Sequence, residues 1–119
     1  MNAVIAGLLA IHVGASSATF RFRTAPATLR AGYTARPLAE CGSGRSVPLR
    51  GTAHFVIHFL PAQTALSFAR QRRLRGAGRL RELAKVCDFE SDLGWAIGLD
   101  RRRPFRVSRA GATVTVVFR

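Results

Sequence analysis

Acidic residues and lysine are both scarce in this sequence of 119 residues. Six Asp and Glu stand against nineteen Lys and Arg, and Lys85 is the only lysine, so arginine supplies nearly all of the formal net charge of +13. A charge of this size attracts polyanions, and nucleic acid, anionic lipid surfaces and anionic wall polymers all qualify. The alternative is that the arginines are spread over a solvated surface without a polyanion ligand. The hydrophobic content of 48% excludes a disordered chain and favours a globular one.

Cysteine is equally sparse, with Cys41 and Cys87 alone. Their spacing excludes a CxxC redox or zinc motif, and too few ligands surround either residue for a zinc site. In an oxidising compartment the two could form one disulfide, which would add about 3 to 4 kcal/mol to the stability. Of these two alternatives, we favour a pair of unpaired thiols.

No hydrophobic run is long enough to cross a membrane as a helix, which takes about 20 residues. The apolar run in residues 1–11 has only about eight apolar positions, and no Lys or Arg precedes it, so it lacks a convincing signal peptide pattern. We interpret the run as a first buried strand, with a vestigial signal as the alternative.

Motifs that carry catalysis are missing as well. The chain has no Gly-x-Ser-x-Gly elbow, no phosphate-binding loop and no Asp-x-Asp-x-Asp-Gly cation loop, and Ser43 lies between glycines without a following helix. His54 and His58 lie about 13 Å apart along a predicted strand, which is too far to chelate one ion. We therefore predict no enzyme activity, no cofactor and no metal site.

Alternating apolar residues predict strands along most of the chain. The clearest is residues 52–60, where alternate positions form an inner and an outer face. The inner face is Ala53, Phe55, Ile57 and Phe59, and the outer face is Thr52, His54, Val56 and His58. Other strands are predicted at residues 4–13, 18–23, 32–36, 93–99, 105–108 and 113–118, with a tight connection between the first two.

Two further segments complete the predicted fold. Residues 24–30 and 63–78 are predicted as loops, and residues 79–86 as one or two helical turns, because Leu80, Leu83 and Val86 have helical spacing. The whole pattern indicates an all-β fold, a small β-sandwich or partly open barrel of about seven strands with one short helical turn. We expect residues 1–119 to form a single domain with Trp95 and the alternating Phe residues in its core.

The charged residues give two candidate sites. In extended form Asp88, Glu90 and Asp92 would share one face, where they could bind a hard cation or act as an acid and base pair. We favour pairing of these acids with neighbouring arginines, since such partners are abundant. The candidate polyanion-binding residues come from two basic runs. They are Arg70, Arg72, Arg73, Arg75, Arg79, Arg81, Arg101, Arg102 and Arg103.

Several short motifs follow one another in an order typical of one family. They are residues 11–14 (Ile-His-Val-Gly), 31–33 (Ala-Gly-Tyr), 42–44 (Gly-Ser-Gly), 47–51 (Val-Pro-Leu-Arg-Gly), 52–59, 88–90 (Asp-Phe-Glu), 95–99 (Trp-Ala-Ile-Gly-Leu) and 104–107 (Pro-Phe-Arg-Val). In these the sequence resembles the AMIN-like domain family of bacterial cell-envelope proteins, small β domains named for their similarity to the targeting module of peptidoglycan amidases. It departs from the family at Ser91, where Gly usually follows Asp-Phe-Glu, and in its short connection at residues 15–17.

The resemblance implies a non-enzymatic binding or targeting module that is secreted or held in the cell envelope. Its partner would be an anionic wall polymer or an envelope protein, attracted by the arginines, with the sheet face of His54 and His58 contacting sugar or protein. One alternative is a basic nucleic-acid-binding protein, which a cytoplasmic location would allow. A second alternative is a structural interaction domain without a polyanion ligand.

Overall fold

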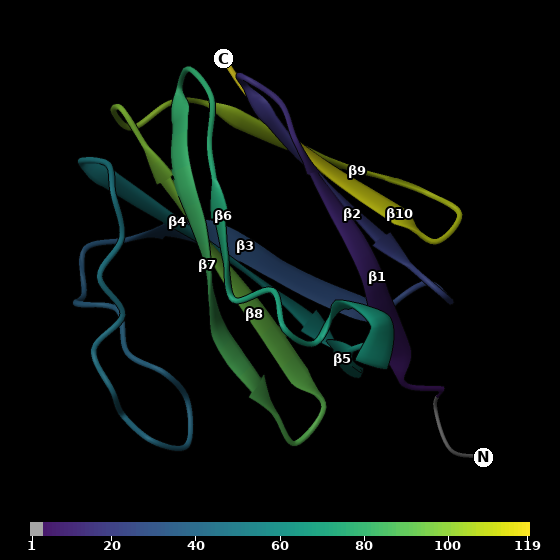
Figure 1. The fold of residues 1–119 in the computed structure, drawn as a ribbon. Coiled ribbons are helices and arrows are strands. Elements are labelled where there is room, and N and C mark those ends of the chain that lie inside the picture. Colours follow the sequence, from purple (N-terminus) through teal and green to yellow (C-terminus); the bar gives the residue numbers. More distant parts are fainter. Residues whose placement is uncertain (1–3) are drawn as a thin grey trace.

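The computed structural model describes residues 4–119, which form two five-stranded β-sheets packed face to face (Figure 1). One sheet has the strand order β5-β1-β2-β10-β9 and the other the order β3-β4-β8-β7-β6. The first sheet comprises β1 (Ala6–Val13), β2 (Ser17–Phe22), β5 (Ala62–Thr64), β9 (Phe105–Ala110) and β10 (Thr113–Phe118). The second comprises β3 (Thr28–Thr34), β4 (Ala53–Leu60), β6 (Arg73–Arg75), β7 (Leu80–Phe89) and β8 (Asp92–Leu99). A 3-10 turn, η1 (Leu66–Phe68), follows β5.

The predicted all-β sandwich is therefore confirmed, with ten strands in place of about seven. Alternate side chains of each strand meet between the sheets and form one large hydrophobic cluster, in which Trp95 is fully buried. The inner face of β4 is the predicted one, since Phe55, Ile57 and Phe59 are fully buried. Edge-on aromatic packing of Phe55 with Phe118, at 5.0 Å between ring centroids, joins the two sheets.

The predicted first hairpin is also confirmed. β1 and β2 pair in antiparallel register, and Gly14 donates its N–H to the Ser17 carbonyl at 2.8 Å within the tight connection. The buried side chains of β2 alternate through Ala18, Phe20 and Phe22, which is the period-two pattern of a half-buried strand.

The predicted helical turns in residues 79–86 are wrong, because this segment is the first part of β7. Its pairing with β8 shifts between Leu80 and Glu82 and again between Lys85 and Cys87. An extra residue in a strand moves every later side chain to the opposite face, so the apolar positions lose their period of two. Apolar residues three apart then imitate the spacing of a helix.

The long loop predicted for residues 63–78 contains three short elements instead. β5 pairs in parallel with β1, η1 follows it, and β6 pairs antiparallel with β7. Each of these strands has only three residues, so neither contains enough alternation to be recognised. In the same way β3 starts at Thr28, inside the loop predicted for residues 24–30.

A covering segment, residues 35–51, runs over the outer face of the second sheet. Its side chains form a second apolar cluster with residues from β4, β7 and β8. The members are Leu38, Val47, Leu49, Val56, Ala84, Val86 and Ala96.

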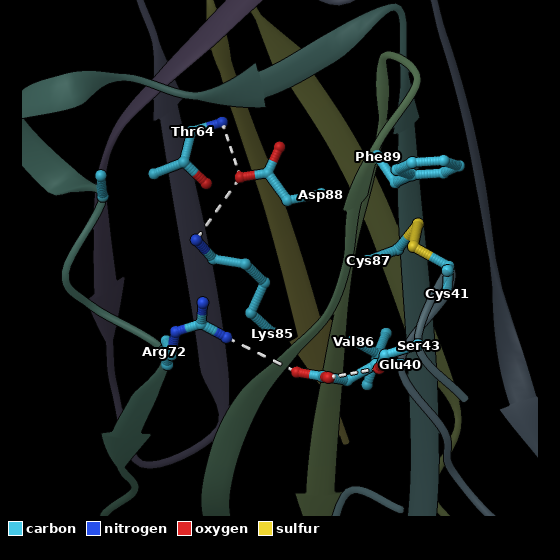
Figure 2. A pocket seen from close by; sticks show the side chains of 12 residues that line it. Glu40, Cys41, Ser43, Thr64, Arg72, Lys85, Val86, Cys87, Asp88 and Phe89 are labelled. Carbon is cyan, nitrogen blue, oxygen red and sulfur yellow. Dashed lines mark hydrogen bonds and ion pairs between the residues drawn. A yellow bond between two sulfur atoms is a disulfide. The ribbon is translucent and has the colours of Figure 1, made fainter. Parts of the chain in front are cut away.

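The prediction of two unpaired thiols is wrong, because a Cys41–Cys87 disulfide fastens the covering segment to β7 (Figure 2). The two cysteines lie 46 residues apart in the sequence, and this spacing does not show that the covering segment passes over β7 at Cys87. A hydrogen bond from the Cys41 N–H to the Val86 carbonyl, at 3.0 Å, holds the same crossing point.

Candidate functional site

Four chain segments meet at one end of the sandwich, at the top of Figure 1. They are the β6–β7 turn, the β8–β9 connection, the residues before β4 and the C-terminus. Backbone hydrogen bonds join them, from Asp100 to the Arg79 carbonyl at 3.0 Å, from Thr52 to Leu99 at 2.9 Å, and from Arg119 to Pro104 at 2.9 Å. Because these segments are far apart in sequence, only the folded sheets bring them together.

Arginines from all four segments gather there, and we call this group the basic end. Its members are Arg50, Arg75, Arg79, Arg81, Arg101, Arg102, Arg103 and Arg119. All of them except Arg103 are exposed. The six between Arg75 and Arg103 belong to the predicted polyanion-binding set. Arg50 and Arg119 were missed, since no basic run surrounds either one and only the strand order places them here.

The carboxylates at this end are already engaged by arginine. Asp100 accepts two hydrogen bonds from Arg103, at 2.9 Å from Nε and 2.8 Å from Nη2. Hydrogen bonding from the Arg103 guanidinium lowers the pKa of Asp100 from 3.8 to about 2. The same contact raises the pKa of Arg103. The Arg103 side chain is 10% exposed, so it holds the β8–β9 connection in place instead of facing a ligand.

The other arginines of the basic end are available to a ligand. Within residues 4–119 no carboxylate forms an ion pair with Arg75, Arg81, Arg101 or Arg102. Two depressions lie between them. One, of about 350 Å³, is lined by Arg50, Arg75, Arg81 and Asp100 together with turn residues.

The second depression lies beside the β8–β9 connection, and its volume is about 570 Å³. Tyr33, His54, Arg101 and Arg102 line it. The Arg102 guanidinium carbon lies 4.9 Å from the centroid of the Tyr33 ring, a distance typical of a cation–π contact. The Tyr33 hydroxyl donates to the Arg103 carbonyl at 2.6 Å and accepts from the Arg103 N–H at 2.8 Å, which fixes the wall of this depression.

The remaining predicted arginines lie elsewhere. Arg72 contacts Glu40 at 3.5 Å, and Arg73 contacts Glu82 at 3.2 Å and the Pro48 carbonyl at 2.7 Å. Arg70 is exposed in the segment after η1. The structure thus divides the predicted polyanion-binding set into the basic end and a second group along β6 and the residues before it.

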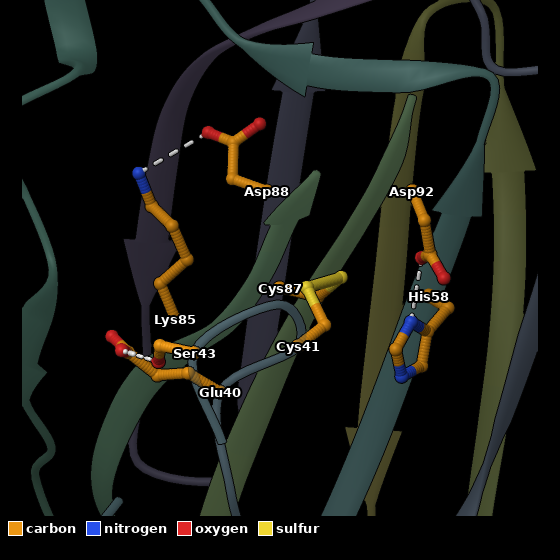
Figure 3. Close-up of a disulfide and its surroundings, with 8 residues drawn as sticks. All are labelled: Glu40, Cys41, Ser43, His58, Lys85, Cys87, Asp88 and Asp92. Atoms are coloured by element: carbon orange, nitrogen blue, oxygen red, sulfur yellow. Dashed lines mark hydrogen bonds and ion pairs between the residues drawn. A yellow bond between two sulfur atoms is a disulfide. The ribbon is translucent and has the colours of Figure 1, made fainter. Parts of the chain in front are cut away.

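His54 and His58 lie on the outer face of β4 as predicted, but this face is not an open surface. Val56, between them, packs under the covering segment. The His58 Nδ1 lies 2.7 Å from Asp92 Oδ1 (Figure 3), whereas His54 lines the depression beside Arg101. The described residues 4–119 contain no group of three or more His, Cys, Asp or Glu side chains that could hold a metal ion.

The predicted pairing of Asp88, Glu90 and Asp92 with arginines is wrong for the two aspartates. Asp88 lies 3.5 Å from Lys85 Nζ, and Asp92 pairs with a histidine. The three acids also do not share an extended face, because the chain reverses between Phe89 and Asp92, with positive φ angles of 51° at Glu90 and 65° at Ser91. The partner of Asp92 lies on the neighbouring strand β4, and the sequence does not show which strands are neighbours.

The fold and the site together define a small β-sandwich domain with one basic end and a disulfide-fastened covering segment. Residues 11–118 match the AMIN-like domain family, and the chain therefore belongs to that family. No curated protein and no solved structure matches the chain. None of the helical structure in residues 4–119 is long and apolar enough to cross a membrane.

Proposed function

We propose that this chain is a non-enzymatic cell-envelope module whose basic end binds an anionic wall polymer. The observation that carries the proposal is the gathering of arginines from four segments at one end, where Asp100 is already bound by Arg103. Four of them, Arg75, Arg81, Arg101 and Arg102, are exposed and offer hydrogen-bond donors as well as charge.

Family membership and the disulfide support the proposed location in the cell envelope. AMIN-like domains are targeting modules of the cell envelope, and the chain's match to them covers nearly all of its length. A disulfide persists in oxidising compartments outside the cytoplasm, which fits an exported protein. We also propose that residues 1–119 act as one domain, since a single core cluster takes side chains from both sheets.

Cosedimentation with purified cell wall tests the proposal. We expect the protein to pellet with the wall at low salt and to be released at high salt, because added ions screen the arginines from the polymer. If the protein does not pellet with the wall at low salt, the proposal is wrong.

Nucleic-acid binding is the second candidate, and the charge of the basic end favours it. Phe20, Phe55 and Phe59 are fully buried and cannot stack on bases, whereas Phe105, which lies beside Arg102 and Tyr33, is 41% exposed. The same experiment with duplex DNA and single-stranded RNA distinguishes the two candidates. Equal affinity for wall and nucleic acid would indicate charge attraction alone, whereas a stronger, salt-sensitive affinity for nucleic acid would favour the second candidate.

A further inference from the structure

A further pocket lies away from the basic end, where Thr64 of β5 and Ala69 face β7 (Figure 2). Its volume is about 500 Å³, and the covering segment forms one of its walls. The pocket combines charged groups on one side with an apolar wall of Phe89 and the Cys41–Cys87 disulfide on the other. Pockets that bind small molecules usually have this combination of an apolar lining and a few polar groups.

Lys85, the only lysine of the sequence, supplies one of the charged groups. Its side chain is 9% exposed, and among residues 4–119 its Nζ forms one hydrogen bond, to Asp88 Oδ2 at 3.5 Å. An ammonium has three hydrogens to donate, so the amine has unused capacity. Burial lowers the pKa of Lys85 despite the nearby Asp88 carboxylate.

Arg72 supplies a second cation beside the first. Its guanidinium lies on the side of the pocket that holds the Lys85 amine, and its positive charge contributes to lowering the pKa of Lys85. Arg72 contacts Glu40 Oε2 at 3.5 Å and its side chain is 73% exposed. Both cations are thus farther from their carboxylates than the 2.7–2.9 Å of a strong charged hydrogen bond. An anion between the two cations would give each of them a further acceptor.

Thr64 adds an unpartnered hydroxyl to the same place. Its Oγ1 is buried and has no hydrogen-bond partner within residues 4–119, while its N–H donates to Asp88 Oδ2 at 3.3 Å. In Figure 2 this oxygen points toward the space beside the Lys85 amine. A buried hydroxyl without a partner is unfavourable, and a bound acceptor would remove this cost.

We propose that this pocket binds the carboxylate of a small monoanion with an apolar part, held between Lys85, Arg72 and the Thr64 hydroxyl. The apolar part of the ligand lies against Phe89, whose side chain is 52% exposed. A monocarboxylate is preferred to a dianionic phosphate, because Asp88 and Glu40 repel each further negative charge in the pocket. This site goes beyond the proposed binding of wall polymer and does not depend on it.

NMR titration with N-acetyl-alanine tests the proposal, with N-acetyl-alaninamide as the matched ligand that lacks the carboxylate. The Cε–Hε cross-peak of Lys85 needs no assignment, because the chain has no other lysine. We expect the acid to shift this peak in a saturable way and the amide to leave it unchanged. Equal shifts with both ligands would overturn the proposal. A third titration uses inorganic phosphate. Tighter binding of phosphate than of N-acetyl-alanine would overturn the choice of a carboxylate as the ligand.

Two variants locate the carboxylate. Thr64→Val keeps the shape of the side chain and removes a hydroxyl without a protein partner, so the stability should be unchanged while the affinity for the acid falls about tenfold. Arg72→Gln should weaken binding by a similar factor. Arg21→Gln removes the same charge from an exposed position in β2 and should leave the affinity unchanged. Equal weakening by Arg21→Gln, or unchanged affinity in Thr64→Val, would contradict the assignment.

Discussion

The Asp100–Arg103 pair shows how single residues shape the basic end. The two charged groups meet through a pair of nearly parallel hydrogen bonds, which is the geometry in which arginine binds a carboxylate best. Arg103 also donates from Nη1 to the Arg119 carbonyl at 3.3 Å. Arg103 thus neutralises Asp100 and joins the β8–β9 connection to the C-terminus. Arg101 and Arg102, in the same connection, are exposed and have no carboxylate partner within residues 4–119.

The lowered pKa of Asp100 predicts a change of stability with pH. A carboxyl whose pKa is lower in the folded protein stabilises it above the unfolded pKa, here 3.8, and this contribution is lost as the pH falls toward about 2. We expect Asp100→Asn to unfold at lower urea concentration than the wild type near neutral pH. The difference should shrink between about pH 4 and pH 2. A difference that stays constant over this range would show that the ionised carboxylate is not responsible.

At the scale of elements, the covering segment determines which part of the second sheet is accessible. It enters β4 by passing closely over β8, where a Cβ at Gly98 would lie 1.7 Å from the Arg50 carbonyl oxygen. Backbone atoms cannot move aside as the end of a flexible side chain can. Gly98 therefore allows a close approach that any larger residue would prevent.

This contact predicts that Gly98→Ala lowers the free energy of unfolding by about 2 kcal/mol or more. Gly32→Ala in β3 is the matched control, because a Cβ there meets no atom within 4 Å, and its effect should be within about 1 kcal/mol of zero. Urea unfolding of both variants provides the measurement. Equal effects of the two substitutions would show that the segment can shift to make room.

Removal of the disulfide should destabilise the protein more than Gly98→Ala, because the bridge fastens the covering segment to β7. Replacing Cys41 and Cys87 by Ala should lower the free energy of unfolding by about 4 kcal/mol, because 46 residues separate the two ends of the bridge. Wild-type protein unfolded in a reducing agent should show the same loss. If neither treatment changes the midpoint in urea, the covering segment is held by its apolar cluster alone.

The sequence predicts those strands in which apolar and polar residues alternate without interruption. β4 is a regular strand without a register shift, so a period of two identified it and its inner face, whereas the β-branched residues of β10 identified that strand. β7 contains two shifts, and β5 and β6 are too short, so the same reasoning missed all three. The candidate site likewise contains residues that the sequence identifies and residues that only the fold brings together. Basic runs identified six arginines of the basic end, whereas Arg50 and the pocket around Lys85 depend on strands that are distant in sequence.

At the scale of the whole molecule, the structure separates two kinds of surface. The basic end gathers exposed arginines around depressions, whereas the pocket at Lys85 balances two cations with two carboxylates. The first suits a long polyanion, which interacts through many weak contacts, and the second suits a small ligand with one carboxylate. The account therefore predicts two separable binding activities, each removed by its own variants.

The central claim is that position, and not net charge alone, makes the basic end bind wall polymer. A basic-end variant replaces Arg75, Arg81, Arg101 and Arg102 by Gln. A control variant replaces the exposed Arg21, Arg23, Arg45 and Arg106 by Gln and so loses the same charge. Each arginine near an anionic surface contributes about 1 kcal/mol, so the loss of four should lower the affinity more than tenfold.

Cosedimentation of these two variants with purified cell wall at low salt is the most direct measurement. We predict that the basic-end variant loses at least about tenfold in affinity and that the control variant stays within about threefold of the wild type. Equal losses in the two variants would contradict the claim and would show that the arginines act only through their total charge.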